Sequence, residues 1–218
     1  MVHASSLLHD DVIDGSDMRR GKPAVHSLYS HKRAVMVGDF VLSVAATMAA
    51  RLRHEGVLVL LSQVLVDLVE GEFMQMGSKE KGDERFNHYL KKSFNKTASL
   101  IAFSCKAVAL LAGANEEVQE IAFQYGKNCG IAFQLVDDLL DFTSTSNSLG
   151  KPNLNDLKSG IATAPVLFAC EKFPDLNAMI MRRFQERDDP RRALEYVIKS
   201  DGLQQTKFLA QKHCQEAI

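Results

Sequence analysis

The chain has 218 residues, of which 46% are hydrophobic and 24% are charged, and its formal net charge is −1. This length suits one domain with a hydrophobic core, and the near-zero net charge gives no support for nucleic-acid binding. No uninterrupted apolar run of about 18 residues is present, so we expect no transmembrane segment. The four cysteines form no CxxC pair, which argues against a zinc site.

Helical periodicity runs through almost the whole chain. Apolar stripes predict long helices over residues 32–53, 57–77, 84–113 and 115–142. The polar segment from Thr143 to Asn155 is predicted to be a loop. Shorter helices are predicted over residues 161–172, 175–186, 190–200 and 203–218. Because strand-like alternation is nearly absent, we expect an all-α bundle of long, mostly antiparallel helices in a single domain over residues 1–218.

Two copies of one acidic pattern each follow an apolar run. They are Asp10-Asp11-Val12-Ile13-Asp14 and Asp137-Asp138-Leu139-Leu140-Asp141. Random placement of the aspartates would give about 0.07 copies of this pattern, so two are unexpected. At helical spacing the first and fifth carboxylates project from one face and repel each other. A divalent cation such as Mg²⁺, shared with a phosphate-bearing substrate, would compensate them. The alternative reading is a solvated helix face.

The residues around both patterns resemble a known family. Leu8 to Asp14, followed by Arg19-Arg20-Gly21-Lys22-Pro23, resembles the first aspartate-rich motif of the trans-isoprenyl diphosphate synthases. Gly130 to Phe142 resembles the second motif. The family's other landmarks follow in order as Gly38-Asp39, Glu70-Gly71-Glu72, Lys96-Thr97-Ala98, Gly150-Lys151-Pro152 and Asp156 to Gly160. The resemblance covers nearly the whole chain and points to the mitochondrial polyprenyl (decaprenyl or solanesyl) branch.

The resemblance implies an isoprenoid-synthase-type bundle around a central cavity and a prenyltransferase reaction. An allylic diphosphate ionises, the cation adds to isopentenyl diphosphate, and loss of a proton leaves a trans chain one isoprene unit longer. Clustered Mg²⁺, three ions per site with diphosphate bound, stabilises the departing diphosphate. The resemblance also implies synthesis of the ubiquinone side chain in mitochondria, by a homodimer or by a heteromer with a second prenyl synthase subunit.

The family's functional residues can be carried over by position. The resemblance implies catalytic roles for Asp10, Asp14, Lys96, Asp137 and Lys151. It makes Asp10, Asp14 and Asp137 Mg²⁺ ligands, and it makes Asp11, Asp138 and Asp141 either ligands or partners that orient bound water. It assigns substrate binding to Arg19, Arg20, Lys96, Thr97, Phe133, Gln134, Lys151 and Lys158. Arginine forks match phosphate oxygens.

Several of these assignments have a simpler structural alternative. The arginine pair could be a solvated basic turn, and Lys96 an ordinary exposed lysine. Phe133 could be a core residue. His9 is either a hydrogen-bond donor to the acidic cluster or a histidine packed between helices.

Product length is expected to depend on the residues four and five positions before the first aspartate, by the same resemblance. These are Ser6 and Ser5. Because both are small, we expect an open channel and a long product. The alternative is that small residues at these positions only allow close helix packing.

The chain begins and ends inside helical patterns, so we expect it to be truncated at both ends. The family's upstream Gly-Gly-Lys and Arg segment is not in this sequence, and poor binding of isopentenyl diphosphate is therefore expected. A truncated non-catalytic or regulatory subunit of a heteromer is the alternative function. A terpene cyclase is less favoured, because its second metal motif differs from a repeated DDxxD.

Overall fold

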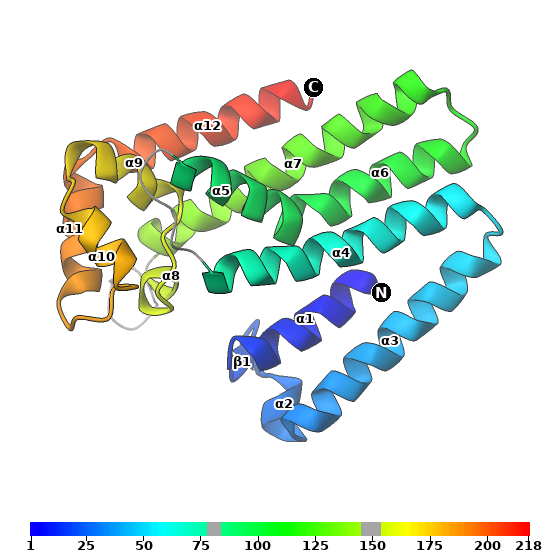
Figure 1. Ribbon diagram of the computed structural model, residues 1–218, viewed down its shortest axis with the longest axis horizontal. Helices are drawn as coiled ribbons and strands as arrows, with labels where there is room; N and C mark the ends of the chain where they lie inside the picture. The colour runs from blue at the N-terminus through cyan, green and yellow to red at the C-terminus, as the bar shows by residue number, and fades with distance from the viewer. Residues whose placement is uncertain (78–83, 145–153) are drawn as a thin grey trace. The chain divides into compact units, whose positions relative to one another are not determined.

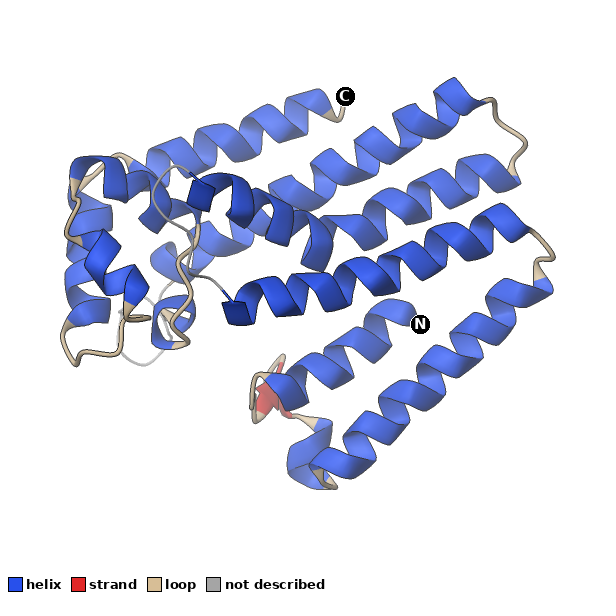
Figure 2. Cartoon of the chain, in the orientation of Figure 1, coloured by secondary structure: helices blue, strands red, loops and turns tan. Residues whose placement is uncertain are grey.

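The computed structural model describes residues 1–77, 84–144 and 154–218. These residues are helical apart from turns, connecting segments and one short hairpin, which confirms the all-α prediction (Figures 1 and 2). They form two compact units, Met1–Val59 and Leu60–Ile218. The predicted site residue Lys151 lies outside the described residues.

The first unit is built on two packed helices. Its elements are α1 (Val2–Ile13), β1 (Met18–Arg19), β2 (Lys22–Pro23), α2 (Val25–Leu28), α3 (His31–Arg51) and the first turn of α4 (Glu55–Gly77). Helix α1, which carries the first acidic pattern at its end, packs against α3. Ser30 caps α3, because its side chain accepts a hydrogen bond from the Arg33 amide.

A glycine determines how closely α1 approaches α3. A Cβ placed on Gly38 would lie 2.2 Å from Nε2 of His9, so only glycine leaves room for this imidazole. The Ser5 hydroxyl, which is 2% exposed, donates a 2.8 Å hydrogen bond to the Gly38 carbonyl. This contact holds the helix that carries the first acidic pattern.

The short antiparallel hairpin β1–β2 was not predicted from the sequence. Met18 pairs with Pro23 and Arg19 with Lys22. Arg20 and Gly21 form the two-residue turn with φ values of 51° and 76°. Two positive φ values at the turn are typical of the type I′ hairpin, whose twist matches that of its strands.

The second unit contains most of α4 and the remaining helices. These are α5 (Glu84–Ser93), the π-helical segment η1 (Phe94–Ala98), α6 (Ser99–Leu111), α7 (Glu116–Thr143), α8 (Asn155–Lys158), α9 (Ala164–Lys172), α10 (Leu176–Met181), α11 (Asp189–Lys199) and α12 (Gly202–Glu216). Helix α7 packs against both α6 and α12. Its N-terminus is capped by Asn115, whose side chain accepts a 2.9 Å bond from the Val118 amide.

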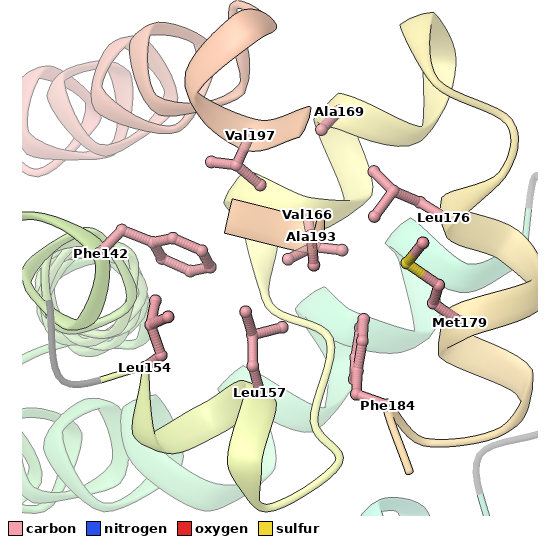
Figure 3. Packing of buried hydrophobic residues seen from close by; sticks show 10 residues of the cluster. All are labelled: Phe142, Leu154, Leu157, Val166, Ala169, Leu176, Met179, Phe184, Ala193 and Val197. Atoms are coloured by element: carbon pink, nitrogen blue, oxygen red, sulfur yellow. The ribbon is translucent and has the colours of Figure 1, made fainter. Parts of the chain in front are cut away.

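Two hydrophobic clusters hold this unit together. One joins the end of α7 to α8–α11 and contains Leu157, Val166, Leu176 and Val197, each of which is fully buried (Figure 3). The other joins α5, η1 and α7 to α9 and α12 around Leu135. Both clusters include residues of α7, so they fix the end of the helix on which the second acidic pattern lies.

Two predicted helices differ from the observed ones. The predicted run over residues 84–113 is interrupted by η1, and the predicted helix over 175–186 ends at Met181. The early end has a backbone cause, because Arg183 and Phe184 have φ values of 56° and 52°. Such left-handed residues stop an α-helix.

Two stretches, His31–Arg51 and Glu84–Leu111, are long and apolar enough by length and composition to cross a membrane. The core helix of a globular protein passes the same test, and the second stretch contains the π-helical segment. The expectation of no transmembrane segment stays a prediction.

Candidate functional site

The three carboxylates of the first acidic pattern differ from one another in burial and in bonding. Asp11 is 3% exposed, and its Oδ1 accepts a 2.7 Å hydrogen bond from Nε of Arg19 and forms an ion pair with Nη2 of Arg19, also at 2.7 Å. This hydrogen bond and the neighbouring acidic charges raise the pKa of Arg19 despite its partial burial. Asp14 is exposed and Asp10 half-buried. Asp11 therefore anchors the turn after α1, while Asp10 and Asp14 are more accessible to a ligand.

The two predicted diphosphate-binding arginines occupy different positions. Arg19 is bonded to Asp11, whereas Arg20 is exposed in the turn of the hairpin. The solvated-turn reading therefore fits only Arg20. An anion at Arg19 would have to share the guanidinium with Asp11, and a guanidinium has enough N–H donors for both.

His9 packs between helices. Its Nε2 lies 3.2 Å from the Val35 carbonyl and 3.4 Å from a carboxylate oxygen of Asp39. Both partners belong to α3, so the imidazole binds α1 to α3 one residue before the first aspartate. The family landmark Gly38-Asp39 supplies the space and one partner for this ring.

The second acidic pattern lies in the last two turns of α7. Asp138 is 1% exposed. Its carboxylate accepts hydrogen bonds from the Tyr89 hydroxyl at 2.5 Å, from Nε2 of Gln134 at 2.9 Å and from the Ala164 amide at 3.4 Å. Burial raises the pKa of Asp138, and these hydrogen bonds oppose the rise. The carboxylate is thus fixed from three elements.

The other two carboxylates of this pattern face different surroundings. Asp141 accepts bonds from the amides of Asn155 at 2.9 Å and Asp156 at 3.1 Å, and so caps the first turn of α8. Asp137 is exposed, and its pKa is raised by partial burial and by the charge of Asp141. The pKa of Asp156 is raised to about 7, chiefly by burial and then by the three carboxylates of the pattern.

Both patterns share one arrangement. The middle aspartate, Asp11 or Asp138, is buried and tied by protein donors, and the first and fifth aspartates are less buried. The accessible groups are all oxygen donors, and those of the second pattern repel one another, which is the donor chemistry of Mg²⁺. Within the three described ranges, no three His, Cys, Asp or Glu side chains are already arranged around a metal position. A bound ion therefore needs further oxygens from water or substrate.

Lys96 and Thr97 lie on the π-helical segment beside α7. A Cβ on Gly130 would lie 2.4 Å from Cα of Ala98, so glycine allows the close approach of α7 to η1. One turn later, Gln134 accepts a 2.6 Å bond from the Thr97 hydroxyl. Short π-helical insertions are frequent at functional sites. The structure thus brings Thr97, Gln134 and Asp138 into one hydrogen-bonded chain.

Lys96 is held by α4. It forms an ion pair with Glu72 and donates a 3.2 Å bond to Oε1 of Gln75. The ordinary exposed-lysine reading is therefore wrong. A diphosphate at this lysine would have to compete with Glu72 or share the ammonium group with it.

The remaining predicted residues are placed individually. Phe133 is 65% exposed on α7, so the core-packing alternative is wrong. Lys158 lies at the end of α8. Ser5 packs into the α1–α3 contact, and the Ser6 hydroxyl bonds the His3 carbonyl within α1 at 3.0 Å. Their proposed effect on product length stays a prediction.

Three residues near the second pattern were not predicted as site residues. They are Tyr89, Lys92 and Asp156. Asp156 belongs to the family landmark Asp156 to Gly160, so the sequence did contain a usable signal for it. Tyr89 and Lys92 on α5 had none, because their proximity to Asp138 depends on packing between helices far apart in sequence.

The chain is similar to known proteins over its whole length. The polyprenyl synthetase family model matches residues 1–198 and so covers both units. The all trans-polyprenyl-diphosphate synthase of Homo sapiens is 58% identical over 218 residues, which are 100% of this chain and 52% of that protein. The mitochondrial solanesyl-diphosphate synthase 1 of Oryza sativa subsp. japonica is 46% identical, over 100% of this chain and 51% of that protein.

A solved structure supports the same fold. A polyprenyl synthase from Caulobacter crescentus, complexed with calcium and isoprenyl diphosphate, aligns with a TM-score of 0.87 and 36% identity, covering 99% of this chain and 67% of that one. The present chain spans about half the length of the curated relatives it matches.

Proposed function

The chain belongs to the polyprenyl synthetase family, and from this premise we propose that it forms the acidic, diphosphate-binding part of a long-chain trans-prenyltransferase. The substrates are an allylic diphosphate and isopentenyl diphosphate. The observation that supports this most directly is the shared arrangement of the two acidic patterns, with a fixed middle aspartate and more accessible first and fifth aspartates.

Mg²⁺ is the proposed cofactor, with three ions per site when diphosphate is bound. Asp10, Asp14 and Asp137 would bind it directly, since each is less buried than the middle aspartate of its pattern, whereas Asp141 already caps α8. Bound Mg²⁺ would neutralise the charge that develops on the departing diphosphate. The relative that binds calcium and isoprenyl diphosphate supports a divalent cation together with this ligand class.

The proposed protein contribution is orientation and charge. Arg19 orients Asp11, and the bonded chain of Thr97, Gln134 and Asp138 holds the end of α7 in place. Lys96 would bind a diphosphate oxygen, and Arg20 another. Lys151 and Lys158 remain proposed diphosphate ligands by position in the family motif.

The biological setting is proposed from the relatives. A plant relative is named as mitochondrial, which supports mitochondrial synthesis of a long polyprenyl tail such as that of ubiquinone. A homodimer, or a heteromer with a second prenyl synthase subunit, is proposed as the assembly.

Ligand binding tests the proposal directly. Binding of farnesyl diphosphate is measured by calorimetry with Mg²⁺ and with EDTA. Asp10→Asn and Asp137→Asn should each weaken Mg²⁺-dependent binding about tenfold or more, because each replaces a charged carboxylate ligand with a neutral amide. Asp201→Asn is the matched control, since Asp201 is exposed at the start of α12 and makes no side-chain capping bond.

Two outcomes would count against the proposal. Binding that is equal with Mg²⁺ and EDTA would remove the metal role, and unchanged binding in both motif variants would remove the site. An isotope assay with isopentenyl diphosphate then separates a catalytic chain from a non-catalytic subunit that only binds diphosphate.

A further inference from the structure

A buried carboxylate on α4 has no part in the proposed function. Asp67 is 6% exposed, and its two oxygens accept hydrogen bonds from two neutral side chains. Nε2 of Gln63, one turn earlier on α4, bonds Oδ1 at 2.8 Å, and the hydroxyl of the fully buried Ser99 on α6 bonds Oδ2. Because a buried donor or acceptor that loses its partner is unfavourable, the second bond holds Ser99 to α4.

Ser99 also completes the π-helical segment. It directly follows η1, and its amide bonds the Phe94 carbonyl five residues earlier, which closes the wide ring of a π-helix. Such turns are rare and occur mostly as single insertions within α-helices. The residue that closes this turn is thus the one whose side chain is bonded to Asp67.

Helix α4 contacts η1 again one and two turns further along. A Cβ on Gly71 would lie 2.6 Å from Cγ of Lys96, so glycine allows the close approach of α4 to η1. Glu72 and Gln75 then bond the ammonium group of Lys96. Together with the Asp67 bond, these contacts fix the register of η1 on α4.

The direction of the Lys96 side chain depends on that register. An α-helix turns by about 100° per residue, and a π-turn contains one residue more than an α-turn. If the segment relaxed to an α-helix, the residues before Ser99 would rotate by about that angle relative to α6. Lys96 would then turn away from its partners on α4.

We propose that Asp67 is a positioning residue for Lys96. By bonding Ser99 it holds the π-turn closed, and the π-turn keeps the Lys96 ammonium group where it would bind a diphosphate oxygen. The role of Lys96 rests on the proposed function, whereas the hold of Asp67 on η1 can be measured without any ligand. Asp67 itself acts only through Ser99.

Three variants separate positioning from stability. Ser99→Ala removes the donor and leaves a buried carboxylate with one partner fewer, so it should also destabilise the fold. Asp67→Leu/Ser99→Ala replaces both partners with apolar groups, which costs far less stability, yet it still removes the bond. Asp67→Asn is the conservative variant, because its amide oxygen still accepts the Ser99 hydrogen. Circular dichroism and urea unfolding identify the variants that fold.

Amide hydrogen exchange, followed by mass spectrometry without ligand, tests the hold on η1. Peptides covering residues 94–99 should exchange about tenfold faster or more in the double variant, and Asp67→Asn should stay near the wild type. Thr206→Val is the matched control, because Thr206 is also fully buried but its hydroxyl bonds the Gly202 carbonyl within α12. Wild-type exchange of η1 in the folded double variant overturns the proposal.

Farnesyl diphosphate binding with Mg²⁺, measured by calorimetry, tests the consequence for Lys96. The double variant should bind about fivefold more weakly. In a Lys96→Gln background the same double substitution should weaken binding less than twofold further, because the positioned group is gone. A purely structural role would give an equal loss in both backgrounds, and that result overturns the positioning role.

Failure of the proposed function would look different. A wild type that does not bind farnesyl diphosphate with Mg²⁺ would count against the proposed function, and hydrogen exchange would still decide whether Asp67 holds η1.

Discussion

The buried middle carboxylates, Asp11 and Asp138, determine how the two acidic patterns are presented. Each would be costly to bury without donors. Arg19 supplies charged donors to the first, and neutral donors supply the second. The pKa of Asp138 is raised, because its burial is only partly offset by these donors and by the charge of Lys92.

Tyr89→Phe should destabilise the second unit. The change keeps the ring in the core but removes the 2.5 Å hydrogen bond to Asp138. A buried acceptor that loses a donor costs about 1–3 kcal/mol, and urea unfolding followed by circular dichroism measures it. Tyr29→Phe is the control, because Tyr29 is 63% exposed. Equal stability of Tyr89→Phe and wild type would contradict the assigned role.

Stability in EDTA should fall as pH rises from about 4 to about 7. Asp156 has a folded pKa of about 7 against an ordinary value of 3.8. In this window the folded chain keeps a proton that the unfolded chain has lost, so rising pH favours unfolding until the folded carboxyl also ionises. The pKa of Asp137 and that of Asp138 are raised too and act in the same direction.

Asp156→Asn identifies the group responsible. The asparagine cannot ionise, so the decrease in unfolding free energy between pH 4 and pH 7 should become shallower than in the wild type. Urea unfolding at several pH values in EDTA gives this slope. An identical slope in the variant would assign the effect to other groups.

At the scale of elements, the contact between α1 and α3 depends on the His9 imidazole, which lies directly against Gly38. Gly38→Ala would place a Cβ 2.2 Å from Nε2 of His9, and the ring would have to leave the Val35 carbonyl. Overpacking of this kind costs about 1–3 kcal/mol. The double variant His9→Ala/Gly38→Ala should recover much of that loss, because the clashing ring is gone.

A double-mutant cycle on unfolding free energy measures this coupling. Strong coupling between the two substitutions is expected. Additive effects would show that the alanine is accommodated without touching His9, and that the family landmark at Gly38 has another cause.

The sequence predicted the positions of the helices better than it predicted the contacts between them. Apolar periodicity and the Asn115 cap located the long helices, because both are local signals. The π-helical segment at Phe94–Ala98 and the end of α10 were missed, since each depends on backbone conformations set by packing. For the site, the acidic patterns were visible as motifs, whereas Tyr89 reaches Asp138 only because α5 packs beside α7.

At the scale of the whole molecule, α3 carries exposed apolar side chains at helical spacing. Met36, Phe40 and Met48 are 60%, 69% and 55% exposed and lie on one face of this helix. Exposed apolar patches on a stable protein mark interaction surfaces. In a two-fold dimer the same patch would be buried on both copies.

The chain should therefore associate with itself as concentration rises, and Phe40→Gln should weaken the association about tenfold or more. Light scattering after size-exclusion chromatography measures the mass over a concentration series. Phe208→Gln is the matched control, because Phe208 is 70% exposed on α12 but has no exposed large apolar neighbour on that helix. A monomeric wild type at all concentrations, or equal effects of the two substitutions, would remove α3 as the interface.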